Sequence, residues 1–383
     1  MSFLNIKIDP NRIYGLDILR AVAIIFVLFD HSGAYIGKSY QMRYRLWIFD
    51  GVSIFFVLSG FLIGGILIKI LESNKPKFRI LIDFWIKRWF RTIPPYFLVL
   101  VISILLSRQF HFSYLGYFIF IQNLVQKQHG FFGESWSLSV EEWFYLLIPS
   151  AIFGLCVYSM KPKKAIIWVA VVILFLITVY RLIKYLYFQV YDFDAFDNSF
   201  RKIVATRLDS IMYGLIGAYL AYYYQEFWLK NKRGKLIVGI FILFGHQFFY
   251  NTGYRPFNIY DVVFSFSVSS FGTLLLLPFL SELKFGHGLF YEILTKISLI
   301  SYSAYLLNLY IIMLHVVNPL LDYLKVKNTL DGNLLGVFLF WSLTISLSII
   351  SYKYFEVPTT ALRNRFKSFT IVKSNSGRKK LIS

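Results

Sequence analysis

The sequence predicts an all-α fold, a polytopic transmembrane helical bundle of about ten spans. Of the 383 residues, 57% are hydrophobic and 16% are charged, whereas a soluble domain carries about 25% charged residues. The chain also contains repeated apolar runs that are long enough to cross a bilayer as helices. The connections between these runs are short, so we expect one membrane domain rather than several soluble domains.

Ten apolar segments approach the length of about 20 residues that a helix needs to cross a membrane. They are residues 14–36, 46–71, 84–106, 139–158, 165–186, 207–228, 236–252, 260–280, 290–316 and 333–356. The run 114–124 is apolar but too short to cross. We expect it to form a re-entrant or interfacial segment that leads into the fourth span.

Lysine and arginine predict the orientation of these spans. With the N-terminus inside, basic residues near the inner ends outnumber those near the outer ends by two to one. We therefore expect both termini to be cytoplasmic. Residues 1–366 would form the membrane domain, and residues 367–383 a basic cytoplasmic tail close to anionic headgroups. The polar N-terminus has no cleavable signal pattern, so the first span would serve as its own signal.

The formal charge is +20, from 40 Lys and Arg against 20 Asp and Glu. In a soluble protein this excess would point to nucleic acid. In a membrane protein it is typical of loops that face anionic lipids, so membrane lipids and not nucleic acid are the expected partners. The single cysteine, Cys156, cannot form an internal disulfide. No His, Cys and Asp cluster has metal-ligand spacing, so no metal cofactor is expected.

Ionisable residues inside apolar segments are costly and mark candidate functional positions. In the first span, Arg20 and His31 are eleven residues apart, which places them on one helix face about 16 Å apart. Asp17 lies one turn before Arg20 and could pair with it. A histidine can take up and return a proton near neutral pH, and an arginine suits an anionic ligand. The alternative is that Arg20 extends to the headgroups and His31 caps the helix.

A second cluster lies at the start of the third span. Arg88 and Arg91 are spaced i, i+3 and therefore share one helix face. Two guanidinium groups placed in this way can bind a phosphate group. The alternative is that they reflect the positive-inside rule alone.

The third stretch precedes the fourth span, where three serines are followed by Glu141 and Glu142. A glutamate at this point could orient or polarise His31, or accept a proton. The alternative is a helix N-terminus that favours acidic residues.

Several further polar positions are weaker candidates. Arg207 and Asp209 could form an intramembrane ion pair, and Glu356 could hold a basic residue at the inner end of the last span. His246 and His315 are single histidines in apolar segments, and we interpret them as core residues.

In this order, the motifs resemble the acyltransferase-3 family, integral membrane O-acyltransferases of the O-antigen and exopolysaccharide acetylase type. The resemblance covers about residues 12–366. The matching stretches are Gly15-Leu-Asp17 through Arg20 to His31, Phe55-Phe-Val-Leu-Ser59-Gly60, Arg88-Trp-Phe-Arg91 with Pro94, Ser135-Trp-Ser-Leu-Ser-Val-Glu141, Arg207-Leu-Asp209, Ser301-Tyr302 with Tyr305-Leu306, and Glu356 with Pro358.

The resemblance implies an enzyme that transfers acyl groups other than amino-acyl groups, from cytoplasmic acyl-CoA, most often acetyl-CoA. The acceptor would be a hydroxyl of a cell-surface or lipid-linked glycan, such as lipopolysaccharide or another polysaccharide. The expected location is the bacterial cytoplasmic (inner) membrane. Arg88 and Arg91 would bind the phosphates of CoA. His31 would act as general base or transient acyl carrier, with Arg20 and Glu141 in support.

Two positions depart from the family pattern. The family often has a histidine after the Tyr-Leu pair of the ninth span, where this chain has Asn308, so no proton-transfer role is assigned there. Glu142 follows Glu141, so either acid could take the family role. Some relatives carry a soluble hydrolase-like domain that is not seen here, so we expect transfer to be completed within the membrane domain or by a partner.

Two other functions fit the same pattern of spans and charges. A transporter or flippase for a glycolipid or small solute would use the intramembrane charges as a proton or substrate path. A structural membrane protein would tolerate the exchange of Arg88 and Arg91 for lysine. The sequence does not identify the acceptor, and it does not separate direct from two-step transfer.

Overall fold

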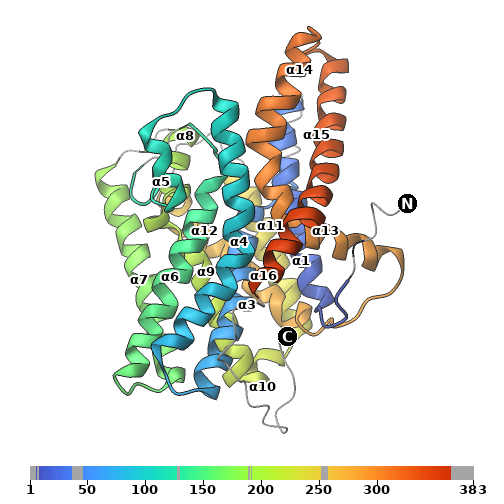
Figure 1. The fold of residues 1–383 in the computed structure, drawn as a ribbon. Helices are drawn as coiled ribbons and strands as arrows, with labels where there is room; N and C mark the ends of the chain where they lie inside the picture. The colour runs from blue at the N-terminus through green and yellow to red at the C-terminus, as the bar shows by residue number, and fades with distance from the viewer. Residues whose placement is uncertain are drawn as a thin grey trace.

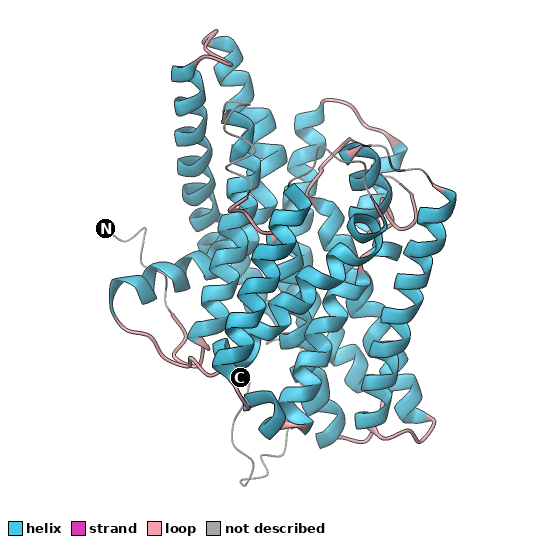
Figure 2. Cartoon of the chain, turned by 180° about the vertical axis from the view of Figure 1, so that it is seen from behind, coloured by secondary structure: helices cyan, strands magenta, loops and turns pink. Residues whose placement is uncertain are grey.

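The computed structural model describes residues 6, 8–36, 46–126, 130–188, 190, 192–251 and 258–363. Every regular element within these residues is helical, and the long helices run side by side as a bundle (Figures 1 and 2). The predicted all-α fold is therefore confirmed. The basic tail expected at 367–383 lies outside the described residues.

The longer helices form the bundle, and short helical turns connect them. The longer helices are α1 (Tyr14–Ser32), α3 (Gly51–Ser73), α4 (Phe78–Ser107), α6 (Ser135–Val157), α7 (Pro162–Tyr187), α9 (Leu208–Tyr223), α11 (Lys232–Asn251), α12 (Ser265–Leu280), α13 (Gly288–Leu307), η6 (Asn308–Val317) and α15 (Leu330–Ser351). The short ones are η1 (Gly33–Tyr35), η2 (Phe112–Tyr114), α5 (Leu115–Phe118), α8 (Phe193–Phe196), η3 (Asp197–Arg201), η4 (Val204–Thr206), α10 (Gln225–Leu229), η5 (Tyr260–Phe264), α14 (Asn318–Tyr323), η7 (Tyr352–Glu356) and α16 (Val357–Leu362).

Eight helical stretches in the described residues are long and apolar enough to cross a membrane. They are Tyr14–Tyr35, Gly51–Ser73, Phe78–Ser107, Ser135–Val157, Pro162–Tyr187, Tyr260–Leu280, Gly288–Tyr323 and Leu330–Leu362. The other two predicted spans coincide with α9, which has 16 residues, and with α11. A multi-span membrane protein is thus supported, while ten spans and cytoplasmic termini remain predictions.

The segment 114–124 does not form a spanning helix. It folds into the turns of η2 and α5 and then an irregular stretch, and the Tyr96 hydroxyl of α4 donates to the carbonyl of Tyr117 at 2.9 Å. The Tyr114 ring stacks on Phe131 with centroids 4.0 Å apart. The first contact holds the segment against α4, and the second holds it against the loop before α6. The segment is therefore non-spanning, as predicted.

Helix α3 begins later than the predicted start at residue 46, because Asp50 caps it. The Asp50 carboxylate accepts hydrogen bonds from the backbone N–H groups of Val52 (3.1 Å) and Ser53 (3.3 Å) and from the Ser53 hydroxyl (2.6 Å). Such a cap satisfies N–H groups that have no partner within the helix. Hydropathy extends the segment backward through apolar residues, but the cap determines where the helix starts.

Helices α3 and α9 pack so closely that their backbones are in contact. A Cβ atom on Gly60 of α3 would lie 2.0 Å from the carbonyl oxygen of Ile211, and one on Gly214 of α9 would lie 2.0 Å from that of Val57. Glycine is therefore required on both sides of the crossing. Small residues serve this purpose in membrane bundles, where van der Waals packing holds helices together.

The chain segment η6–α14 and the adjoining part of α15 project beyond the other helices at one end of the bundle (Figures 1 and 2). Asn318 at the start of α14 accepts a hydrogen bond at 2.9 Å from the hydroxyl of Tyr35, which follows α1. The end of α1 that carries His31 is thereby fixed to the base of this projection.

We predict that Gly214→Ala destabilises the protein by about 1–3 kcal/mol, because the added methyl group collides with backbone that cannot move aside. The thermal unfolding midpoint of the purified protein in detergent measures this effect. The matched control is Gly154→Ala in α6, where a Cβ atom meets nothing within 4 Å. Equal midpoints for the two variants would contradict the close crossing.

Candidate active site

Two cavities among the described residues contain the predicted site residues. The first, here called the arginine cavity, has a volume of about 600 Å³ and is lined by Arg20 of α1, Arg88 and Arg91 of α4, Glu141 of α6 and Glu356 of η7. The structure therefore brings four of the five predicted site residues, Arg20, Arg88, Arg91 and Glu141, to one cavity. These four come from three helices that are distant in sequence.

The second, here called the histidine cavity, has a volume of about 350 Å³. Its polar lining includes His31 of α1, Asp50 before α3, Glu134 before α6, and Asp197 with Arg201 of η3. Aromatic rings also line it, among them those of Trp136 and Phe266. His31 is thus separated from the other four predicted residues, although α1 connects Arg20 to it.

Val52 and Tyr305 line both cavities and therefore lie between them. The Tyr305 hydroxyl accepts a hydrogen bond from Ser137 at 2.6 Å and donates one to the carbonyl oxygen of Glu134 at 3.0 Å. Both bonds tie α13 to the start of α6. The two cavities are therefore close neighbours that share part of their lining.

The arginine cavity is rich in positive charge. Arg88 is paired with Glu141 at 3.4 Å and bonded to the Tyr145 hydroxyl, and its guanidinium lies 4.2 Å from the Tyr145 ring centroid. Within the described part of the chain, Arg20 and Arg91 have no hydrogen-bond or ion-pair partner. Unpaired like charges around a cavity repel one another, so this arrangement favours an anionic ligand.

Asp17 does not pair with Arg20, contrary to the prediction from their spacing. It pairs with Arg12 and accepts a hydrogen bond from Ser298 of α13 at 2.6 Å. Arg12 precedes α1 and can fold back over the first turn of the helix, where a carboxylate is already favoured by the helix dipole. Arg20 is left without a carboxylate partner at the cavity.

Glu141 makes its hydrogen bonds within the arginine cavity and not with His31. Its carboxylate accepts from the hydroxyls of Ser59 (3.1 Å) and Tyr145 (2.8 Å) and pairs with Arg88. Glu142 accepts from the Thr92 hydroxyl at 2.9 Å and faces α4. Because α6 begins at Ser135, both acids lie beyond its first turn and do not cap it. Glu141 therefore lines the arginine cavity and is not in contact with His31.

His31 contacts η6 and not Glu141. Its Nδ1 lies 2.5 Å from Oδ1 of Asn308, the first residue of η6. His31 therefore lines the histidine cavity with one ring nitrogen already engaged.

Glu134 is a candidate residue that the sequence interpretation did not select. Its side chain is buried, Oε1 accepts a hydrogen bond from the backbone N–H of Tyr310 at 3.0 Å, and Oε2 has no partner within the described residues. Burial raises the pKa of this carboxyl to about 8, because removal from water disfavours its charged form. The signal in the sequence was an acid directly before an apolar segment, a pattern that normally indicates a helix start.

A family model described as an acyltransferase domain, acyltransferase-3, matches residues 13–353 of the chain. The chain belongs to the acyltransferase-3 family. The matched range includes the five residues predicted for the site, Arg20, His31, Arg88, Arg91 and Glu141. The resemblance seen in the motifs is therefore confirmed.

The individual relatives that match this chain include bacterial proteins named as O-acetyltransferases. The chain is 27% identical over 404 aligned positions to O-acetyltransferase OatA of Staphylococcus aureus, covering 96% of this chain and 60% of that protein. It is 32% identical over 168 positions to peptidoglycan O-acetyltransferase OatA of Listeria monocytogenes, covering 39% of this chain and 25% of that protein. The chain thus spans less than two thirds of the length of these relatives. No solved structure matches it.

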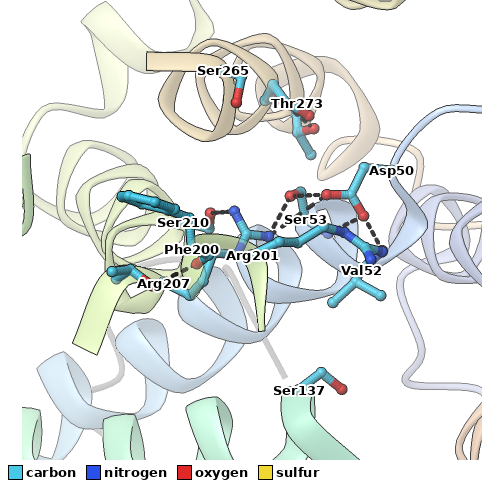
Figure 3. A network of polar contacts seen from close by, with 12 residues as sticks. Asp50, Val52, Ser53, Ser137, Phe200, Arg201, Arg207, Ser210, Ser265 and Thr273 are labelled. Atoms are coloured by element: carbon cyan, nitrogen blue, oxygen red, sulfur yellow. Dashed lines mark hydrogen bonds and ion pairs between the residues drawn. The ribbon is translucent and has the colours of Figure 1, made fainter. Parts of the chain in front are cut away.

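Two ion pairs with buried arginines lie near the histidine cavity. Arg207 donates to the hydroxyls of Ser53 (2.9 Å) and Ser210 (3.3 Å) and lies 3.6 Å from the Asp50 carboxylate (Figure 3). Asp209 pairs at 2.8 Å with Arg181 of α7. The predicted pair of Arg207 with Asp209 is therefore wrong. Residues two apart point to different sides of a helix, so each finds its partner on another element.

Asp197 holds the loop that borders the histidine cavity. It pairs with Arg201 at 2.6 Å and with Lys202. Burial acts to raise the pKa of the Asp197 carboxyl, but the two positive charges outweigh burial, and the pKa lies below its ordinary value.

Glu356 was expected to hold a basic residue. In the structure it is buried and accepts a hydrogen bond from the Ser303 hydroxyl of α13 at 3.0 Å. The last span is thus tied to α13 at the edge of the arginine cavity.

We predict that Asp209→Asn costs about 3–5 kcal/mol of stability, because it leaves the buried Arg181 without a counter-charge. A double-mutant cycle of Arg181→Met and Asp209→Leu should show a coupling free energy of about 0.5–3 kcal/mol. The control is the cycle of Arg207→Met with Asp209→Leu, for which we expect a smaller coupling. A larger coupling in the control cycle would restore the pairing of Arg207 with Asp209. Unfolding by denaturing detergent measures all these values.

Proposed function

We propose that the protein is a membrane-bound O-acyltransferase that moves an acetyl or other short acyl group from cytoplasmic acyl-CoA to a hydroxyl of a cell-surface or lipid-linked glycan. The main supporting observation is that α1 carries the unpaired Arg20 in one cavity and His31 in the other. The family match supports acyl transfer. The names of the relatives support acetyl as the group and a glycan as the acceptor.

The arginine cavity is the proposed entrance for the donor. Arg88, Arg91 and Arg20 would bind the phosphate groups of CoA, since guanidinium groups bind phosphate through paired, charge-assisted hydrogen bonds. The positive-inside rule would place this cavity toward the cytoplasm of a bacterial inner membrane. The long pantetheine arm would then carry the thioester along α1 toward His31.

The histidine cavity is the proposed acceptor site. Aromatic rings with a few convergent polar groups are typical of ligand pockets, and here Trp136 and Phe266 lie beside Glu134, Asp50 and His31. His31 would take the proton of the acceptor hydroxyl while its oxygen attacks the thioester carbon. The carbon–sulfur bond breaks, and the imidazolium returns the proton to the thiolate. The products are the acyl ester and free CoA, and His31 is restored.

We predict that Arg91→Lys raises the KM for acetyl-CoA by on the order of tenfold, because lysine offers a point charge in place of a planar pair of donors. The measurement is CoA release by the purified protein at varied acetyl-CoA concentration. The matched control is Arg108→Lys, at the exposed far end of α4 and outside both cavities. An unchanged KM in Arg91→Lys would remove Arg91 from the donor site.

We also predict that His31→Ala abolishes acyl transfer while expression and membrane insertion persist, because the proton acceptor is lost. Mass spectrometry of surface glycans should show the loss of one acetyl group per modified sugar, which would also identify the acceptor. The control is His287→Ala at an exposed position before α13.

An active, purified His31→Ala variant would overturn the catalytic assignment. A transporter or flippase would move its glycan without consuming acetyl-CoA. Glycan movement without CoA release in the wild-type protein would therefore favour that alternative.

A further inference from the structure

We infer that Asn308 is a positioning residue that holds His31 in the tautomer with the proton on Nδ1 and leaves Nε2 as the nitrogen that meets the substrate. The inference rests on the proposed function for its catalytic meaning. The tautomer itself follows from hydrogen bonds alone.

The orientation of the Asn308 amide is fixed by its own helix. Its side-chain nitrogen donates to the carbonyl oxygens of Ala304 (2.9 Å) and Tyr305 (2.8 Å). An amide nitrogen has two hydrogens, and both are used here by groups that can only accept. Rotating the amide would bring its oxygen against two carbonyl oxygens. The network therefore determines which atom faces His31.

The atom that faces His31 is the amide oxygen, 2.5 Å from Nδ1. An amide oxygen accepts hydrogen bonds and cannot donate them, so Nδ1 must carry the hydrogen. In a neutral imidazole ring the second nitrogen, Nε2, then has the free lone pair. His31 lines the histidine cavity, so Nε2 is the base available there.

The backbone around Asn308 is held from two directions. Helix α13 ends at Leu307 and the wider π-helical turns of η6 begin at Asn308, which is buried. The Glu134 carboxylate accepts from the N–H of Tyr310, and the Glu134 carbonyl accepts from the Tyr305 hydroxyl. Glu134 thus holds residues on either side of Asn308. A change to π-helical winding is frequent at functional sites.

This tautomer has a consequence for the reaction. When Nε2 takes the proton of the acceptor hydroxyl, the ring becomes an imidazolium whose Nδ1–H is already bonded to the Asn308 oxygen. The ring does not have to rotate or exchange a proton before transfer. If the acyl group is carried on the histidine, it is attached at Nε2 for the same reason.

The experiment is nitrogen NMR of the full chain in lipid nanodiscs, with ¹⁵N-labelled histidine rings and at a pH where the rings are neutral. Among the six histidines, the signal of His31 is identified by its loss in His31→Gln. We expect a protonated Nδ1 and an unprotonated Nε2 in the wild-type protein. A wild-type ring with its proton on Nε2 would overturn the inference, whatever the activity.

Two variants separate positioning from structural support. Asn308→Leu and Asn308→Asp both lose the bonds to the carbonyls of Ala304 and Tyr305, but the aspartate keeps an oxygen for Nδ1–H. We expect the leucine variant to lose the Nδ1–H tautomer, and its kcat to fall by about tenfold to a hundredfold with little change in KM for acetyl-CoA. The aspartate variant should keep the tautomer and retain more activity. Equal losses in both variants, or an unchanged tautomer in the leucine variant, would contradict the inference.

The matched control is Asn74→Leu, at the C-terminal end of α3, which loses a side-chain hydrogen bond to the carbonyl oxygen of Ile70 and lines neither cavity. It should leave the tautomer and kcat unchanged, and a loss of the tautomer there would also count against a specific role of Asn308. An active His31→Gln enzyme would contradict the proposed function but would not alter the assignment of the tautomer. A failure of the proposed function can therefore be distinguished from a failure of the tautomer assignment.

Discussion

The backbone contact between α3 and α9 is the constraint on which the site depends. Gly60 and Gly214 allow the two helices to meet without intervening side chains, and this fixes α3 in the middle of the bundle. From there α3 serves both cavities, with Asp50 and Val52 at one end and Ser59, which donates to Glu141, further along. Separating the two helices would move the lining of both cavities at once. In a membrane such a contact depends on van der Waals packing, because the hydrophobic effect does not drive helices together within lipid.

The sequence could predict the helices because the bilayer demands long apolar segments, and each predicted span overlaps a helix. It could not predict their starts equally well, since those depend on single polar groups such as the Asp50 cap. Partners of charged residues were also hard to predict. Local spacing suggested Asp17 with Arg20 and Arg207 with Asp209, whereas Asp17 pairs with Arg12 and Asp209 with Arg181. Buried charges select the partner with the best geometry, and for Asp209 that partner lies on another helix.

The site predictions were most successful for residues that lie on the same helix. Arg20 and His31 share α1, and Arg88 and Arg91 share α4, so spacing alone could group each pair. The roles of Glu134 and Asn308 depend on contacts across 176 and 277 positions of sequence, which no local pattern encodes. Asn308 seemed uninformative in the sequence because it cannot transfer a proton. The structure gives Asn308 a different significance. Its amide oxygen can only accept a hydrogen bond, so the nitrogen of His31 that faces it must carry the proton.

The shared lining residues Val52 and Tyr305 have a consequence for the proposed reaction. Bacterial membranes store energy as a proton gradient, and a continuous column of water through a protein would discharge it. If the proposed reaction joins a donor on one face to an acceptor on the other, the protein needs a passage for the acyl group and a barrier to ions at the same place. The Tyr305 hydroxyl is fastened on both sides, to Ser137 and to the Glu134 carbonyl. The proposed transfer would therefore have to pass a tyrosine whose hydroxyl is already held from both sides.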